Sequence, residues 1–275
     1  MLYLGTCSFN YPSWETLVYT DTDPATFLAQ YATQYASVEI DQWFWSLGKS
    51  SVRLPDSTTV ALYDAATPKE FRFTVKAPNA LSSPFAYRSK KERNRWFLDV
   101  ELYYRFLDQL APLFDKIGAI ILQFPYLNRE AFSERAHFAD ALTDFVQRTP
   151  DTISLAIEIR NPQWLDDSWF ALLDEYSVAP TLLSGYWMDG FLQSVQSALT
   201  YPSDLLIIRL HGSDRGAIEA LTGEVWNRRV QPQVQELTAL AALLKGQQER
   251  EIYLNVNNHY EGSAPLTIAF LEKLL

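Results

Sequence analysis

The segment SVEID, residues 37–41, alternates between polar and apolar side chains. Because successive side chains of a strand point to opposite faces, Glu39 shares a polar face with Ser37 and Asp41. The segments FRFTVK at 71–76 and SLAIEIR at 154–160 show the same alternation. An open parallel sheet buries both faces under helices and reads apolar throughout, whereas a closed barrel accepts polar layers in its lumen near the mouth. The pattern therefore favours a closed barrel.

Strand-like segments alternate with helix-like segments along the whole chain, which is typical of a parallel sheet with crossover helices. We expect strands at residues 2–6, 37–40, 71–76, 117–124, 153–159, 178–183, 205–210 and 252–257. We expect helices at residues 24–35, 60–66, 91–110, 129–148, 169–176, 191–198, 233–247 and 265–274. With 275 residues and 48% hydrophobic content, the chain matches one α/β domain over residues 1–275, a (β/α)8 TIM barrel.

The 33 acidic and 23 basic side chains leave a net charge of −10. Such a charge repels polyanions at a distance, so we expect neither nucleic acid nor a membrane as a partner. One short run is nevertheless basic. We interpret it as the solvated start of a helix, with a phosphate-contacting face as the alternative, and it comprises Arg88, Lys90, Lys91, Arg93 and Arg95.

The chain begins with the strand-like LYLG rather than with a secretory leader, and it contains no apolar run of about 18 residues. We therefore expect a cytoplasmic protein. Cys7 is the only cysteine, which excludes an internal disulfide. Because a free cysteine usually behaves as a small apolar residue, we expect Cys7 in a small buried slot.

The carboxyl ends of the predicted strands carry ionisable or amide side chains, and in a barrel these ends form the mouth where ligands bind. Glu39 and Glu158 end the second and fifth strands, and they are our candidate general base and general acid. The alternative is structural. In that case each carboxylate is the fixed partner of a neighbouring cation, such as Arg160 or Arg209.

Positive charge gathers at the same predicted mouth. Lys76, Arg160 and Arg209 are expected to bind an anionic group of the substrate, because guanidinium groups bind planar oxyanions through two hydrogen bonds. Gln123, at the end of the fourth strand, is counted with these substrate-binding residues. A network in which cations and acids neutralise one another is the alternative.

Two of the three histidines, His211 and His259, follow strand ends, and we count both as candidate catalytic residues because imidazole transfers protons near neutral pH. Structural hydrogen bonding is the alternative. Asn257 shares a face with His259 and is expected to orient a ligand hydroxyl. Trp14 and Trp164 are candidate rings for stacking a substrate, although large aromatic side chains also fill gaps between loops.

A metal site is conceivable from two carboxylates and two imidazoles, a set that suits zinc or manganese. The neighbouring cations oppose a divalent ion, and the sequence contains no HxH or HExxH spacing. We therefore assign no metal ligand. No cofactor follows from the sequence, and neither does an oligomeric state.

The motifs together resemble those of the DUF72 family, also called YecE-like, an uncharacterised group with a TIM-barrel fold. The resemblance is carried by GTCSFNYPSW (5–14), VEIDQWFW (38–45), FRFTVKAP (71–78), ILQFP (121–125), EIRNPQW (158–164), RLHG (209–212) and NNHYEGSAP (257–265). The chain departs from the family pattern where a Thr-His pair is replaced by Ser82 and Ser83, and where Arg-His becomes Arg160 and Asn161. The resemblance implies the fold and the place of the site, but no substrate.

Three functions are compatible with these patterns. The first is a metal-independent hydrolase, lyase or isomerase that uses acid/base chemistry on a small anionic or sugar-like (polyol) substrate. The second is a metal-dependent phosphoesterase, similar to nuclease barrels. The third is a noncatalytic ligand-binding or regulatory barrel, which the two missing family histidines favour.

Overall fold

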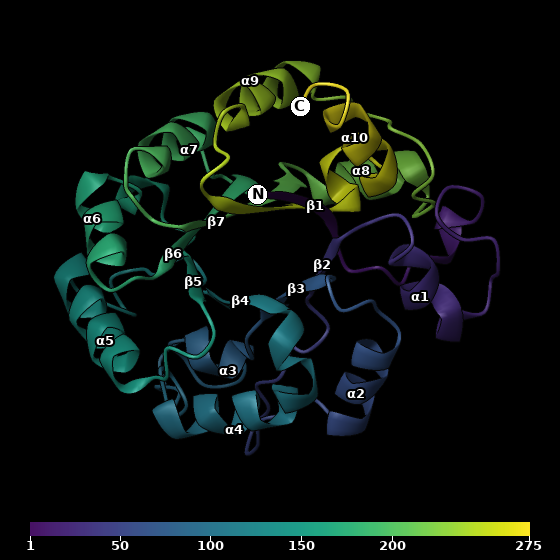
Figure 1. Cartoon of the computed structure of the whole chain (residues 1–275). Coiled ribbons are helices and arrows are strands. Elements are labelled where there is room, and N and C mark those ends of the chain that lie inside the picture. Colours follow the sequence, from purple (N-terminus) through teal and green to yellow (C-terminus); the bar gives the residue numbers. More distant parts are fainter.

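The computed structural model describes all 275 residues. Its eight strands are parallel and close into a barrel in chain order, with β8 paired to β1 (Figure 1). The (β/α)8 TIM barrel expected from the sequence is confirmed. The strands are β1 (Leu2–Cys7), β2 (Ser37–Ile40), β3 (Arg72–Lys76), β4 (Ile117–Gln123), β5 (Leu155–Glu158), β6 (Ala179–Gly185), β7 (Leu205–Gly212) and β8 (Glu251–Val256).

The helices form a ring around the barrel, as Figure 1 shows. The α-helices are α1 (Phe27–Tyr31), α2 (Ser57–Ala65), α3 (Asn79–Ser82), α4 (Val100–Leu110), α5 (Arg135–Arg148), α6 (Asp167–Glu175), α7 (Phe191–Leu199), α8 (Arg215–Thr222), α9 (Val234–Leu244) and α10 (Ala264–Leu271). Short 3-10 turns are η1 (Pro12–Trp14), η2 (Pro24–Thr26), η3 (Ala111–Lys116), η4 (Pro162–Trp164) and η5 (Asn258–Tyr260). None of these helices has the length and apolar character needed to cross a bilayer.

The largest difference from the sequence prediction lies at residues 91–110. The helix begins only at Val100, where the Asp99 side chain accepts a hydrogen bond from the Leu102 backbone N–H at 2.6 Å. The preceding residues form a loop in which Phe85 pairs with Arg93 in antiparallel fashion. This pairing engages backbone groups that a helix would need, so the basic run is not the start of a helix. Helices α3 and α8 were not expected from the sequence.

The barrel lumen has an apolar layer at its amino-terminal end and a polar layer toward its mouth. In the apolar layer Tyr3 stacks on Tyr253 with ring centroids 4.8 Å apart. Gly118 leaves room for this pair, since a Cβ at that position would lie 2.1 Å from the Tyr253 hydroxyl. The layer also contains Ala119, Ile121, Ala156, Ala179, Leu205 and Ile207. The polar faces predicted from the strand alternation thus lie inside the barrel.

Candidate functional site

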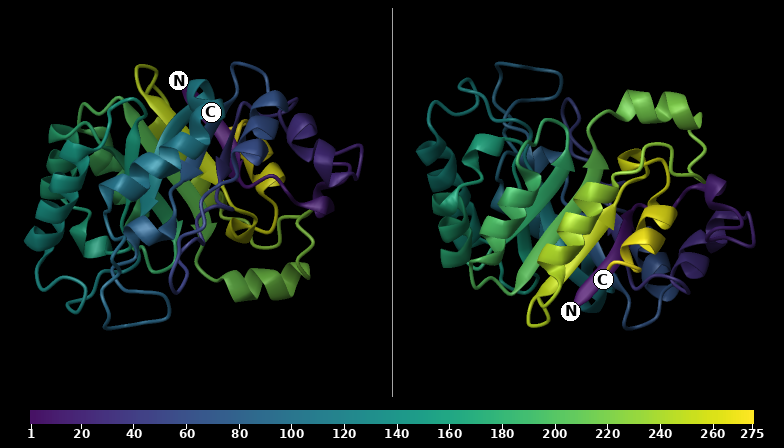
Figure 2. Two further views of the ribbon diagram at one scale, coloured as in Figure 1. Left: turned by 90° about the horizontal axis from the view of Figure 1, so that it is seen from below. Right: turned by 90° about the horizontal axis from the view of Figure 1, so that it is seen from above.

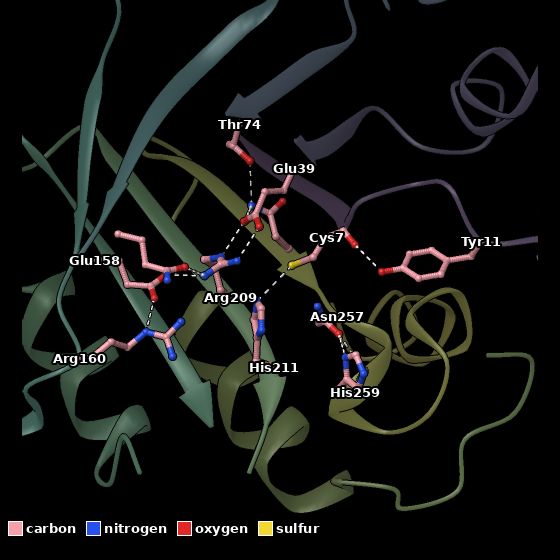
Figure 3. Close-up of polar contacts among 12 residues, drawn as sticks. Cys7, Tyr11, Glu39, Thr74, Glu158, Arg160, Arg209, His211, Asn257 and His259 are labelled. Carbon is pink, nitrogen blue, oxygen red and sulfur yellow. Dashed lines mark hydrogen bonds and ion pairs between the residues drawn. The ribbon is translucent and has the colours of Figure 1, made fainter. Parts of the chain in front are cut away.

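The guanidinium of Arg209 lies at the centre of the polar layer (Figure 3). Its Nε and Nη2 donate to the two carboxylate oxygens of Glu39, at 2.7 and 2.6 Å. Its Nη1 donates to Glu158 at 2.6 Å and to the Gln123 amide oxygen at 3.1 Å. Arg209, Glu39 and Glu158 are fully buried. Because a buried charge is costly unless it is paired, this network holds strands β2, β4, β5 and β7 in one arrangement.

The strand register places further polar side chains beside this network. Glu39 is the register partner of Thr74, and Arg209 is that of Asn255. The Asn255 amide donates to Glu39 at 3.2 Å and to the Thr74 hydroxyl at 2.9 Å. Thr74, Asn255, Glu39 and Arg209 therefore form a continuous floor under the mouth.

Glu158 is paired on both oxygens, because Arg160 Nε donates to the oxygen that Arg209 leaves free, at 2.5 Å. Burial by itself would raise the pKa of Glu158, but the positive charges of Arg160, Arg209 and Lys76 outweigh it and lower the pKa to about 2. Glu158 is thus ionised at neutral pH. The geometry supports the structural alternative for this carboxylate, in which it holds two cations in place.

A cavity of about 650 Å³ lies at the mouth above this floor. Four of the residues singled out from the sequence line it: Lys76, Gln123, Arg160 and His211. Its remaining walls are mostly aromatic and comprise Phe44, Trp45, Tyr126, Tyr186 and Trp187, together with Pro162 and Gln163. The structure therefore combines cationic donors with ring faces in one space.

Lys76 differs from the other mouth cations because no carboxylate lies within ion-pairing distance of its Nζ. The Nζ instead lies 3.8 Å from the centre of the Phe44 ring, and the residue is only 6% exposed. Burial, reinforced by the Arg209 charge, lowers the pKa of Lys76 to about 8 despite the nearby Glu39 and Glu158. Lys76 is therefore a cation that releases its proton close to neutral pH.

His211 and Cys7 form a second buried pair beside the floor. The Nε2 of His211 lies 3.5 Å from Cys7 Sγ. Burial lowers the pKa of His211 well below its usual range, and burial raises the pKa of the Cys7 thiol. Both side chains are therefore uncharged at neutral pH. Cys7 is 1% exposed, so the expectation of a small buried slot is confirmed.

Ligand atoms of Cys7, Glu39 and His211 lie within 4.8 Å of one another, which is close enough to hold a metal ion. Both Glu39 oxygens already accept hydrogen bonds from Arg209. A metal ion at this position would have to compete with Arg209 for the Glu39 oxygens. It would also be repelled by the positive charge of the guanidinium, so these three side chains fit a metal poorly.

His259 and Asn257 lie in a separate cluster under helix α8. Their side chains contact each other at 2.6 Å, and His259 Nε2 lies 3.1 Å from the Glu219 carboxylate. The ring of Trp226 lies 4.8 Å from that of His259. Neither His259 nor Asn257 lines the mouth cavity. The set of two carboxylates and two imidazoles considered from the sequence is therefore not gathered around one point.

Trp14 and Trp164 do not line the mouth cavity either. Trp14 is fully buried, and its indole N–H donates to the Asn258 side chain at 3.3 Å. Trp164 stacks on Phe138 with ring centroids 5.8 Å apart. These two rings fill space around the barrel because large apolar side chains gain most from burial. Neither ring is positioned to contact a substrate in the mouth cavity.

The rings that do line the mouth follow strand ends directly. Phe44 and Trp45 come just after strand β2, and Tyr186 and Trp187 come just after β6. Tyr186 and Trp187 have φ angles of 49° and 61°, so the chain turns sharply there. Their proximity to strand ends was the available sequence signal, and Gly185, the last residue of β6 with a φ angle of 122°, also marks the sharp turn.

A family model described as a protein of unknown function, DUF72, matches residues 3–275. The chain belongs to the DUF72 family. Two crystal structures of DUF72 proteins resemble this one. The protein from Thermotoga maritima has a TM-score of 0.69 at 20% identity, covering 100% of this chain and 98% of its own. The protein from Enterococcus faecalis has a TM-score of 0.70 at 22% identity, covering 100% and 95%.

These DUF72 structures are too distant in sequence to show more than the shared fold. Among curated proteins no match to this chain was found. The chemistry of this DUF72 protein therefore depends on the residues that line its own mouth cavity.

Proposed function

We propose that this DUF72 protein is a metal-independent acid/base enzyme that binds a small anionic or sugar-like substrate in the mouth cavity, with Lys76 as the proton-transfer group. The observation that carries the proposal is the position of Lys76. It is buried, it has no acidic partner, and it lines the cavity. A buried amine without a partner costs stability, and active sites are where proteins commonly retain such groups.

Arg160 and Gln123 supply the donors that would hold the anionic group. Arg160 uses its Nε for Glu158, which leaves its two Nη groups for a ligand. Gln123 uses its amide oxygen for Arg209, which leaves its amide N–H groups. Arg209 points its donors at Glu39, Glu158 and Gln123, so it positions other residues rather than contacting substrate.

This arrangement suits abstraction of a proton from a carbon beside a carboxylate or carbonyl group, as in an isomerase or a lyase. Near neutral pH Lys76 is available both as an amine and as an ammonium, because its pKa is lowered to about 8. His211, an uncharged imidazole in the wall of the same cavity, would exchange a second proton or orient the substrate. Glu39 and Glu158, the candidates from the sequence, would act through the cations that they hold.

The test combines binding with carbon-proton exchange. Hydroxy acids, oxo acids and sugar acids are screened for thermal stabilisation of the protein, and each stabilising compound is then incubated with it in D2O. We expect loss of one carbon-bound proton signal by NMR, and we expect Lys76→Met to abolish this loss while the compound still binds. Exchange that persists in Lys76→Met excludes Lys76 as the proton-transfer group.

The same test separates an enzyme from a noncatalytic binder. A compound that stabilises the wild-type protein but is neither exchanged nor converted indicates a ligand-binding barrel. The matched control variant is Lys245→Met, which removes an exposed lysine that lines neither the mouth nor its floor.

A further inference from the structure

A second and larger cavity adjoins the mouth. It has a volume of about 1020 Å³ and lies between the loops that follow strands β2, β3 and β4. Trp45 and Tyr126 line both this groove and the mouth cavity, so the two spaces share a wall. In Figure 2 the blue loops that contribute to it protrude beyond the end of the barrel.

The walls of the groove are tied together by hydrogen bonds. In the loop after β2, Leu47 pairs with Val52, and the Asn79 side chain accepts from the Leu47 backbone N–H at 2.8 Å. Arg95 donates to the Ser50 carbonyl at 3.3 Å and so links the loops after β2 and β3. Such ties reduce the ordering that a ligand must impose, which favours binding.

The groove is basic although the chain is acidic. Its charged lining residues are four cations, Lys49, Arg53, Arg88 and Lys90, and one carboxylate, Glu130. None of the four cations belongs to a salt bridge of the structure. In a protein of net charge −10, this concentration of unpaired positive charge makes the groove the part of the mouth rim best suited to an anion.

Aromatic rings are exposed in the same groove. Trp45 is 82% exposed, Tyr126 58% and Tyr87 44%. Large aromatic side chains are normally buried. Three exposed rings beside unpaired cations therefore indicate a surface that a ligand covers. Proteins bind nucleotides and single strands of nucleic acid by contacting the phosphate groups with lysine and arginine and by stacking the planar bases on aromatic rings.

We propose that this groove binds a nucleotide, either free or at the end of a single strand, with its phosphates on the cations and its base on Trp45 or Tyr126. The inference goes beyond the proposed function, because the groove adjoins the mouth cavity but contains none of the residues assigned to proton transfer. It replaces the expectation that nucleic acid is excluded by net charge, since the local charge of the groove is positive. The groove itself does not depend on the chemistry proposed for Lys76.

The test measures binding of thymidine monophosphate and of 5′-phosphorylated pentathymidylate by titration calorimetry at about 50 mM salt, where phosphate contacts are strong. We expect the double variant Arg53→Ala/Arg88→Ala to raise the Kd about tenfold or more, and to flatten its salt dependence. The matched control is Lys245→Ala/Lys273→Ala, which changes the net charge equally at exposed positions outside the groove. We expect its Kd to stay within about twofold, because distant exposed charges are screened.

A second pair of variants tests the stacking. Trp45→Ala should raise the Kd about tenfold, whereas Trp187→Ala, an exposed ring of the mouth that does not line the groove, should not. Equal binding of the two probes identifies a mononucleotide site, and binding of pentathymidylate alone identifies a strand site. Both outcomes support the inference.

Three outcomes would overturn the inference: no binding of either probe by the wild-type protein, equal losses in the two double variants, or binding that depends on Lys76 but not on Arg53 and Arg88. If Lys76→Met still binds the nucleotide, the assignment of the groove as a nucleotide site holds even where the proton-transfer proposal has failed.

Discussion

The guanidinium of Arg209 on strand β7 donates two hydrogen bonds, of 2.7 and 2.6 Å, to the carboxylate of Glu39 on strand β2 across the lumen of the barrel. The two residues are separated by 170 positions in the chain, and both are fully buried. Their contact connects the two halves of the barrel and orients the guanidinium toward Glu158 and Gln123. This pair is part of the floor under the mouth cavity.

Glu39→Gln should destabilise the protein by roughly 3–5 kcal/mol, because it leaves the buried Arg209 charge without its bidentate partner. Urea unfolding at pH 7 measures the loss. The control is Asp144→Asn, which breaks the exposed pair with Arg148 and should change the unfolding free energy little. Equal losses of unfolding free energy in the two variants would show that the buried pair stabilises the protein no more than the exposed pair does.

Lys76→Met should stabilise the protein at pH 7 by roughly 1–3 kcal/mol, because it removes a buried charge that has no carboxylate within ion-pairing distance. The pKa of Lys76 is lowered from 10.5 to about 8, so between these values the unfolded chain holds a proton that the folded protein has released. The destabilisation is full below pH 8 and diminishes as the pH rises toward 10.5. The stability difference between variant and wild type should therefore shrink from pH 7 to pH 10.

The control for Lys76 is a second buried lysine with an acidic partner. Lys116 pairs with Asp64 at 2.7 Å and donates to the Thr67 carbonyl at 2.9 Å. Lys116→Met should therefore destabilise the protein, the opposite sign to Lys76→Met. If Lys76→Met also destabilises at pH 7, then Lys76 is held by favourable contacts and the argument for its functional role fails.

Glu158→Gln should cost stability at neutral pH and progressively less in acid. The pKa of Glu158 is lowered from 4.5 to about 2, so its contribution is present in full above pH 4.5 and is lost as the pH falls toward 2. Such a shift corresponds to about 3 kcal/mol at pH 6. Urea unfolding between pH 6 and pH 3 compares wild type and variant, and a difference that stays constant over this range would contradict the assigned ion pairs.

Gly118→Ala should destabilise the barrel by about 1–3 kcal/mol, because the added methyl group overlaps the Tyr253 ring. Tyr253→Leu in the same chain should recover part of this loss by making room, which a double-mutant cycle measures. Gly216→Ala in the exposed start of α8 is the control, since the nearest atom to its new Cβ would lie 3.7 Å away. That change should be neutral or slightly stabilising.

The sequence alone was sufficient for the barrel and for the direction of its polar faces. The alternation in residues 37–41 and 154–160 is a property of neighbouring residues, and it placed Glu39 and Glu158 inside the barrel together. The eight strands follow from the same local rule, and their predicted boundaries lie close to those of the structure. Loop structure was less predictable, because pairing such as that of Phe85 with Arg93 depends on contacts between segments.

Tertiary structure decided which of the polar residues face a ligand. From the sequence, Glu39, Glu158 and His259 were candidate catalytic residues at strand ends. Lys76 and Arg209 were candidate substrate-binding residues at the same ends. The folded chain pairs the carboxylates with Arg209, turns His259 toward Glu219, and leaves Lys76 unpaired beside the cavity. Charge pairing and burial depend on distances between strands far apart in the chain, and for that reason no local pattern of residues contains them.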